Sequence, residues 1–502
     1  MQDQIINEFN SLVKVKATES VTSIRKMLAA KYGMSLTTIR RILAKETPKV
    51  TSSRAFVITG WELRVKPDCK FTAILENIAR HYKAELYVTS LNEDEAEFIP
   101  EELGKFKVLT EDLEFNSNFQ FKYVQTKALS ASPINGWNGI FKHSTIIPGL
   151  IKDLKTEKST HLCRQIMSSG SIGYLNAEKR DYDFITDAES RKTLDRKWKS
   201  AERYKVTKAF IEAERFTKPT ALIIEIKDDK VFFCRYITMT ESGVVYDRNL
   251  KFEYGKSQPE ISRPLSLIAG DFHSYYTDEA NLNALKNIAL EYQPESLGLN
   301  DFYEGAGTNR HLWDDFGKIL KMPTLAEEKL VSRKHILELA SFFKKVYYLI
   351  SNHDNFLVKY LANENQYRYN RNYLDAIELR AWAIRNNRHP IIKYLELDTI
   401  ENLEVIDEGA DFQIAENYIM HGHVGLGGAR SGFRALAKVY DKMICGHFHS
   451  PNIIKNAVCV GTSSKLQMEY NLGAGDWLHS HALVQPDGNV QLLNVINGEY
   501  KV

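Results

Sequence analysis

Histidine, aspartate and asparagine side chains recur in five short motifs in the second half of this sequence. Two divalent cations roughly 3.5–4 Å apart require a bridging carboxylate, surrounding imidazole and oxygen ligands, and an open position for water. One motif alone is weak evidence, because a lone histidine is more often a surface or core residue than a ligand. The ordered set indicates a two-metal site that hydrolyses phosphate esters. In chain order the motifs are Gly270-Asp271-Phe272-His273, Asn300-Asp301, Asn352-His353-Asp354, His421-Gly422-His423 and Gly446-His447-Phe448-His449.

Each motif follows a short apolar stretch that we predict to be a buried strand. Helical patterns over about 279–292 and 325–344 separate the first three of these strands, which is the order of a parallel α/β sheet. Open α/β sheets bind their ligands beyond the carboxyl ends of the strands. We therefore expect the five strand ends to converge. The predicted strands are 264–269, 296–299, 346–350, 418–420 and 442–445.

The ordered motifs resemble those of the calcineurin-like metallophosphoesterase superfamily, whose pattern is DxH, GDxxD, GNHD/E, a histidine often followed by glycine, and GHxH. The resemblance covers about residues 262–500 and implies an α/β domain built as a four-layer αββα sandwich. It also implies two sets of metal ligands that share one bridging carboxylate. These are Asp271, His273 and His449 for one ion, Asn352, His421 and His447 for the other, and Asp301 between them.

The same resemblance assigns catalytic roles to the third motif. His353 corresponds to the family's catalytic histidine that is not a ligand, and Asp354 corresponds to its orienting partner. Asn300 and Ser351 stand where the family usually has glycine. No ligand position of the pattern is missing.

The chemistry expected of such a site is phosphoester hydrolysis. A water between two cations has its pKa lowered toward neutrality and attacks phosphorus in line with the leaving oxygen. His353 would contact the phosphate or protonate the leaving oxygen, because the pKa of imidazole lies near the operating pH. Carboxylate, amide and imidazole ligands together favour two Mn²⁺ ions, with Mg²⁺, Fe²⁺ or Zn²⁺ as alternatives. A metal-free binding scaffold is disfavoured because every coordinating position is filled.

Two segments near the motifs are candidates for contacting phosphate. His311 follows Asp301 by ten residues and either contacts phosphate or belongs to a surface loop. The glycine-rich segment 425–438 carries Arg430 and Arg434. Its guanidinium groups and backbone amides either follow a phosphodiester backbone or form part of a flexible loop.

The amino-terminal segment 1–50 is predicted to be helical and carries nine Lys and Arg residues against four Asp and Glu residues. Ala29, Gly33 and Ile39 have the spacing of the small residue, the turn glycine and the buried aliphatic residue of a helix-turn-helix. DNA contact, oligomerisation or partner docking, and simple packing remain open as interpretations. The residues placed where such proteins meet a duplex are Thr37, Arg40 and Arg41.

Length and composition predict a globular chain of several domains, with 502 residues of which 43% are hydrophobic. The expected domains are a helix-turn-helix-like head over 1–50, an α/β middle region of unknown role over 54–255 and a phosphoesterase domain over 262–502. Five widely spaced cysteines without a CxxC motif favour the reducing cytoplasm. No apolar run of about 18 residues occurs, so no membrane span is expected.

This order of parts is similar to that of the pre-early DNA-degradation proteins of large tailed phages. The favoured function is a manganese-type DNA phosphodiesterase that degrades host DNA in the host cytoplasm, with DNA as partner and a homo-oligomer as the expected assembly. One alternative is a phosphomonoesterase that acts on small molecules or phosphoproteins. The other is a non-catalytic regulator that binds DNA.

Overall fold

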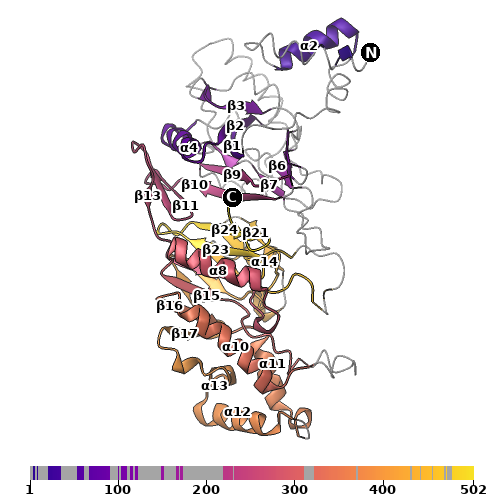
Figure 1. Ribbon diagram of the computed structural model, residues 1–502, viewed down its shortest axis with the longest axis vertical. Helices are drawn as coiled ribbons and strands as arrows, with labels where there is room; N and C mark the ends of the chain where they lie inside the picture. The colour runs from indigo at the N-terminus through magenta and orange to yellow at the C-terminus, as the bar shows by residue number, and fades with distance from the viewer. Residues whose placement is uncertain are drawn as a thin grey trace. The chain divides into compact units, whose positions relative to one another are not determined.

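In the computed structural model the chain divides into two compact units, and the described residues of the second are those from Phe233 to Val502 (Figure 1). The predicted boundaries near residues 50, 255 and 262 stay predictions. No helix among the described residues is long and apolar enough to cross a membrane. The structure describes residues 4, 5, 8, 21–34, 54–61, 67–90, 100, 103–109, 113–116, 119–121, 148–151, 166–168, 170–172, 219–229, 231–309, 322–368, 371–429, 432–440, 442–454, 456–468, 471 and 477–502.

The first unit contains a sheet in which β9, β1, β2 and β3 are neighbours in that order. Strand β1 is entirely buried and pairs antiparallel with β9. It pairs in parallel with β2, as expected for two apolar strands that are connected through a helix. Helix α4 supplies that connection, and the Asp68 side chain caps it by accepting from two backbone amides. The elements are β1 Ala55–Trp61, α4 Cys69–Tyr82, β2 Glu85–Ser90, β3 Lys107–Leu109, β8 Gly170–Ser171 and β9 Thr220–Ile226, with a second sheet of β4 Leu113–Asn116, β5 Phe119–Phe121, β6 Pro148–Ile151 and β7 Ile166–Ser168.

The amino-terminal segment contributes helix α2, Val21–Tyr32, which ends at a turn. Gly33 has a φ of 61°, a conformation that glycine adopts without a Cβ penalty. This matches the predicted first helix and turn glycine. The predicted second helix, with Thr37, Arg40 and Arg41, lies outside the described residues.

The second unit is mixed α/β and contains a six-stranded sheet in the order β17-β16-β15-β14-β23-β24. Strands β14 to β17 are parallel, and the sheet ends in an antiparallel pair. Helices α8 and α10 connect the parallel strands, as the helical patterns predicted. The bounds are β14 Ser266–Ile268, α8 Glu279–Tyr292, β15 Ser296–Leu299, α10 Leu325–Ala340, β16 Lys345–Leu349, β17 Leu403–Ile406, β23 Ser480–Val484 and β24 Val490–Asn494.

Helix α10 is shorter than its periodic pattern predicted. It begins at a capping box in which Thr324 and Glu327 satisfy each other's backbone amides. It ends before Ser341, whose hydroxyl donates to the Glu338 carbonyl at 2.6 Å. That hydrogen bond occupies a backbone carbonyl that would otherwise accept within the helix. The helix therefore ends at Ala340, and the residues up to 344 connect it to β16.

A second sheet of five strands has the order β18-β19-β20-β22-β21. Strands β19, β20 and β22 are parallel, so the loops that follow them leave from the same edge. This sheet carries the two histidine-rich motifs nearest the carboxyl end of the chain. Its strands are β18 Gln413–Ile414, β19 Asn417–Met420, β20 Lys442–Cys445, β21 Asn452–Ile454 and β22 Asn456–Cys459.

Side-chain alternation along the strands gives this unit two apolar layers. Leu267 joins a large cluster with α8 and α10, whereas its neighbour Ile268 joins a cluster that contains Ile419 and Ile444 of the second sheet. Figure 1 shows α8 and α10 along the same sheet. The α/β class is therefore confirmed, whereas the four-layer αββα arrangement stays a prediction.

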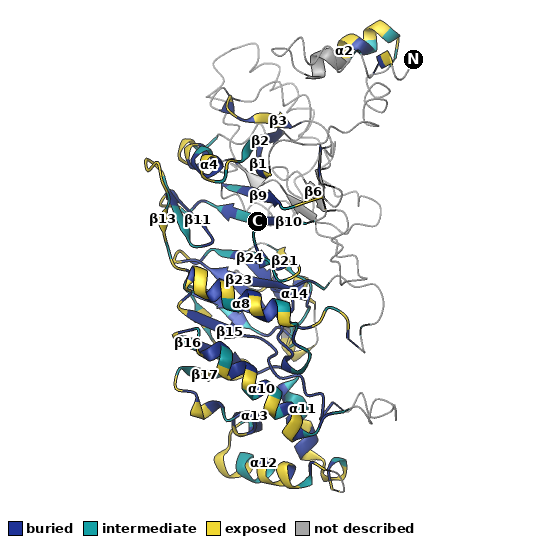
Figure 2. Cartoon of the chain, viewed as in Figure 1, coloured by how far each residue is buried: buried dark blue, intermediate teal, exposed yellow. Residues whose placement is uncertain are grey.

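Further helices follow the parallel strands of the second unit. Figure 2 shows that α12 is largely exposed, in contrast to the buried strands. Sequence reasoning did not predict α12 or α13. The remaining elements are β10 Phe232–Thr238, β11 Val244–Asp247, β12 Leu250–Glu253, β13 Glu260–Ile261, α11 Asp354–Ala362, α12 Tyr373–Asn386, α13 Pro390–Tyr394, α14 Phe433–Leu436 and the 3₁₀ turns η2 Ser274–Tyr276, η4 Glu364–Gln366, η5 Leu397–Thr399 and η6 Leu426–Gly428.

A buried ion pair joins strands β10 and β11. The Arg235 guanidinium donates from Nε to Asp247 Oδ1 at 2.6 Å and from Nη2 to Oδ2 at 2.8 Å, and Gln491 donates to the same carboxylate. Asp247→Asn should lower the free energy of unfolding by about 3–5 kcal/mol, because it removes the negative charge that faces the buried guanidinium. Denaturant unfolding followed by circular dichroism measures this loss.

The control is Glu260→Gln, which breaks an exposed pair with Lys256. That change should cost less than about 1 kcal/mol. Equal losses for the two variants would contradict the importance of the buried pair.

Candidate metal centre

Every predicted metal ligand follows the carboxyl end of a parallel strand. Asp271 and His273 follow β14, Asp301 follows β15 and Asn352 follows β16, all in the first sheet of the second unit. His421 follows β19, and both His447 and His449 follow β20, in the second sheet. The site is therefore assembled from two sheets, as expected for ligands beyond strand ends.

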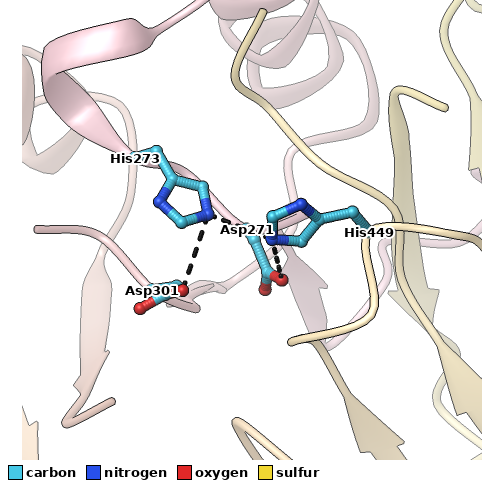
Figure 3. Close-up of side chains that lie close together, drawn as sticks. All are labelled: Asp271, His273, Asp301 and His449. Carbon is cyan, nitrogen blue, oxygen red and sulfur yellow. Dashed lines mark hydrogen bonds and ion pairs between the residues drawn. The ribbon is translucent and has the colours of Figure 1, made fainter. Parts of the chain in front are cut away.

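Four of these residues form a buried cluster with their polar atoms facing one another (Figure 3). His449 Nε2 lies 3.1 Å from Asp271 Oδ2 and 3.1 Å from His273 Nε2. His273 Nε2 lies 3.5 Å from Asp301 Oδ2. Each side chain offers one ligand atom, and all four atoms lie within 4.8 Å of one another, so the group could hold a metal ion.

Asp301 also faces a second set of side chains. Its Oδ2 atom lies 3.6 Å from His421 Nε2, which in turn lies 2.7 Å from Asn352 Oδ1. The His447 ring packs edge-on against the His421 ring, with the centroids 5.1 Å apart. One carboxylate thus stands between two groups of nitrogen and oxygen atoms.

The backbone around these ligands is unusual. His273, Asp301, His447 and His449 have φ values of 46°, 45°, 72° and 57°. Residues other than glycine rarely adopt this left-handed region, and such residues cluster at functional sites. The surrounding fold must hold these four side chains in directions that an ordinary extended loop would not give them.

Glycine is required beside the cluster. A Cβ atom on Gly446 would lie 1.9 Å from Asp271 Oδ1 and 3.2 Å from Asn300 Cβ. The loop that follows β20 can therefore approach the Asp271 carboxylate only because position 446 has no side chain. Asn300, at a position where the motif pattern that this chain resembles has glycine, is itself buried and donates from Nδ2 to the Ala269 carbonyl.

The electrostatics of the cluster fit a cation. Both side-chain oxygens of Asp271 and Oδ1 of Asp301 are buried and have no hydrogen-bond partner among the described residues. Burial raises the pKa of Asp271 to about 6, and burial lowers the pKa of His421 to about 4. Neutral imidazoles beside carboxylate oxygens that lack hydrogen bonds are metal donors, and a bound cation would offset the cost of burying the charges.

The pKa of His273 also indicates that the surrounding carboxylates favour a positive charge. Burial lowers its pKa, but the Glu304 and Asp301 carboxylates outweigh burial and raise the pKa to about 9. The carboxylates therefore favour a cation at this place. The oxygen and nitrogen donors together suit a borderline divalent metal, because no thiolate is among them.

Glu304 is a site residue that sequence reasoning missed. Its Oε2 atom lies 2.6 Å from His273 Nδ1, and its backbone carbonyl lies 2.7 Å from His353 Nδ1. A carboxylate on the far nitrogen of a ligand imidazole fixes the ring's orientation. The sequence could have identified Glu304, because Asp301 and Glu304 have the spacing of the two acidic positions in GDxxD.

His353 lies beside the cluster and is only partly buried. A carbonyl oxygen only accepts, so Nδ1 of His353 must donate to Glu304, and Nε2 is left facing Asp301 Oδ2 at 3.8 Å. His353 also belongs to a second group, with His273 and Glu304, that could hold a metal ion. Its ring is therefore oriented with one nitrogen toward the centre.

Asp354 makes hydrogen bonds to Tyr348 and Ser351. Its buried carboxylate accepts from the Tyr348 hydroxyl at 2.6 Å and from the Ser351 amide at 2.7 Å, and the Ser351 hydroxyl adds a third bond. Burial raises its pKa to about 7. Glu304 contacts the His353 imidazole, whereas the Asp354 carboxylate bonds within the turn that presents Asn352. The catalytic role of Asp354 stays a prediction.

Of the residues predicted to contact phosphate or DNA, only Arg434 lies among the described residues. Arg434 is exposed on α14, and Phe433 of the same helix packs near Phe448, which lies between two predicted ligands. His311, Arg430, Thr37, Arg40 and Arg41 lie outside the described residues.

Comparison with known proteins relates the chain to a phage protein. It is similar to Protein A1 of Escherichia phage T5, with 26% identity over 325 residues. That alignment covers 60% of this chain and 58% of the phage protein, so it spans less than two thirds of either. No protein-family model matches the chain. No solved structure matches it.

Proposed function

We propose that this chain is a two-metal phosphodiesterase that cleaves DNA. The observation that carries the proposal is the place of Asp301, whose Oδ2 atom lies 3.5 Å from His273 Nε2 and 3.6 Å from His421 Nε2. A carboxylate between two groups of donors is what a pair of divalent cations requires. The motif resemblance and the similarity to a phage protein support the same proposal.

The residues that would hold the cations form two sets. Mn²⁺ is the ion we propose, because it accepts mixed oxygen and imidazole ligands. When bound, two such ions supply an activated water and neutralise charge on the phosphoryl oxygens. The first set is Asp271, His273 and His449, the second is Asn352, His421 and His447, and Asp301 is shared.

The proposed role of His353 is proton transfer to the leaving oxygen. Because Nδ1 donates to the Glu304 carbonyl, a protonated ring carries its transferable proton on Nε2, the nitrogen that faces the centre. Glu304 would position both this ring and His273. Exposed basic residues near the second sheet, Arg434 and Lys438, would meet the DNA backbone.

His353→Ala should lower turnover about a hundredfold or more, the scale of lost general acid catalysis, while bound metal stays unchanged. The measurements are kcat on DNA with Mn²⁺ and metal content by mass spectrometry. The control is His81→Ala, at an exposed position on α4. Loss of metal together with activity would make His353 a ligand, as its grouping with His273 and Glu304 permits.

The proposed function is tested with purified full-length protein, linear and circular DNA, and p-nitrophenyl phosphate, each with Mn²⁺ or with EDTA. We expect Mn²⁺-dependent cleavage of DNA and little release of p-nitrophenol. Hydrolysis of the monoester alone would point to a phosphomonoesterase. DNA binding without cleavage after metal loading would point to a non-catalytic regulator. Degradation of host DNA during phage infection is the biological role that we propose for the activity.

A further inference from the structure

Glu328 of helix α10 is a fully buried carboxylate that is not one of the proposed metal ligands. Its Oε1 atom accepts from the Ala306 amide at 2.8 Å, and its Oε2 atom accepts from the Gly307 amide at 3.0 Å. The Tyr303 hydroxyl adds a bond to Oε2 at 3.3 Å. A buried carboxylate is costly unless such donors satisfy it. This acid is therefore an anchor inside the fold for the loop that follows β15.

The anchored loop has glycine at two positions where it passes close to Glu328. Gly305 has a φ of 75°, a conformation that glycine adopts without a Cβ penalty. A Cβ atom on Gly307 would lie 2.7 Å from the Pro323 carbonyl oxygen and 3.4 Å from Glu328 Oε2. The Thr308 amide donates to the Gly305 carbonyl at 2.9 Å and closes the turn. The loop is thus held closely between the Glu328 carboxylate and the Pro323 carbonyl.

The same loop contains Glu304, which contacts two imidazoles of the candidate centre. Its carboxylate Oε2 lies 2.6 Å from His273 Nδ1, and its carbonyl accepts from His353 Nδ1 at 2.7 Å. That carbonyl belongs to the peptide unit that joins Glu304 to Gly305. The next amide along the chain is the first one that Glu328 accepts from. A shift of the anchored loop would therefore move the acceptor that orients the His353 ring.

A second polar side chain of α10 reaches the loop that follows β14. Ser332 is fully buried, and its hydroxyl lies 2.6 Å from the hydroxyl of Ser274, the residue after His273. Helical residues four apart lie on the same face, so Ser332 and Glu328 point the same way. Other buried residues of this helix join the large apolar cluster. One face of α10 thus supports two loops of the centre with polar side chains.

We propose that Glu328 is a positioning residue of the candidate metal centre, which anchors loop 303–309 so that the Glu304 carbonyl stays in place for His353. The inference rests on the proposed phosphodiesterase function, because it gives Glu328 an influence on the rate of that reaction. Groups that orient an imidazole at a metal site change activity about ten- to a hundredfold when they are removed. An anchor with a structural role alone would lower stability without acting through His353.

Glu328→Gln should lower kcat for DNA cleavage at saturating Mn²⁺ about ten- to a hundredfold and leave KM nearly unchanged. Glutamine keeps the size of the side chain but turns a donor nitrogen toward one of the two backbone amides. Hydrogen exchange of the metal-free protein gives a readout that does not depend on activity. Peptides that contain residues 303–309, followed by mass spectrometry, should exchange faster in Glu328→Gln than in the wild type.

A double-mutant cycle separates positioning from a general weakening of the fold. Because Glu328 is proposed to act through His353, adding Glu328→Gln to His353→Ala should leave kcat at the value of His353→Ala alone. A loss that multiplies the loss of the single variant would show that Glu328 acts elsewhere, and would overturn the proposal.

Gly307→Ala tests the same loop without a change to Glu328, since the new Cβ would meet the Pro323 carbonyl. It should show the same fall in kcat at an unchanged KM, and the same faster exchange. Glu338→Gln is the matched control, because it removes a carboxylate of the same helix that pairs with Lys286 of α8. It should match the wild type in kcat and in the exchange of loop 303–309.

The outcomes separate this inference from the proposed function. A wild type that does not cleave DNA with Mn²⁺ would overturn the phosphodiesterase itself. If the wild type cleaves DNA, and folded Glu328→Gln and Gly307→Ala proteins have its kcat, the positioning role fails while the phosphodiesterase stands. Exchange of residues 303–309 at the wild-type rate in Glu328→Gln would also overturn the positioning role, because the carboxylate would then not anchor the loop.

Discussion

Asp301→Asn is expected to abolish metal-dependent hydrolysis of DNA, with a loss of about a thousandfold or more, the scale reported when a group that stabilises developing charge is removed. Asp301 Oδ2 lies within 3.8 Å of imidazole nitrogens from His273, His353 and His421. A neutral amide cannot supply the negative charge that two cations would share. Metal content and DNA cleavage with Mn²⁺ are the two measurements.

The control for this change is Asp398→Asn, at an exposed position in the same unit. It should retain full activity and full metal content. An Asp301→Asn protein that binds as much metal as the wild type and cleaves DNA at the same rate would refute the shared-carboxylate arrangement. Loss of metal with a normal circular dichroism spectrum would attribute the effect to the centre rather than to unfolding.

Gly446→Ala is expected to lower activity about a hundredfold or more, because a displacement of about 1 Å in a catalytic group can cost that much. The new methyl group would overlap Asp271 Oδ1, to which the distance is 1.9 Å. Either the carboxylate or the loop that carries His447 must move. Titration with Mn²⁺ should show weaker binding, and DNA cleavage should fall in parallel.

Gly432→Ala is the matched control, since apart from its chain neighbours no atom in the described part of the chain lies within 4 Å of a Cβ built there, and its φ is −83°. It should match the wild type in affinity and rate. A Gly446→Ala protein with wild-type affinity for Mn²⁺ would show that the two loops can separate without harm to the centre.

The strands and helices beside the site were largely predictable from sequence. Apolar runs bounded by polar motifs located the five ligand-bearing strands, and α8 has the predicted bounds Glu279–Tyr292. Parallel strand order within each of the two sheets then places the following loops at the carboxyl edge of that sheet. Four predicted ligands do form one buried cluster. These features depend on local periodicity and on the rules that connect neighbouring elements.

Other features depend on contacts between residues far apart in the chain. The left-handed φ of Asp301 and His449 is imposed by the folded environment, not by residue type. Trp477 reaches His449 from a separate segment, and no periodic pattern marks it. Glu304 is different, because its spacing from Asp301 could have identified it. The domain boundaries and the predicted DNA contacts remain predictions.

The division of the ligands between two sheets has a consequence for the fold itself. Asp271, His273 and Asp301 leave one sheet, whereas His421, His447 and His449 leave the other. A cation bound by both groups would act as a cross-link between two layers that also pack through apolar side chains and share hydrogen bonds such as that from Asn417 Nδ2 to the Gly488 carbonyl. Chelation would then loosen the packing of the whole unit, and its melting temperature would follow the concentration of free metal.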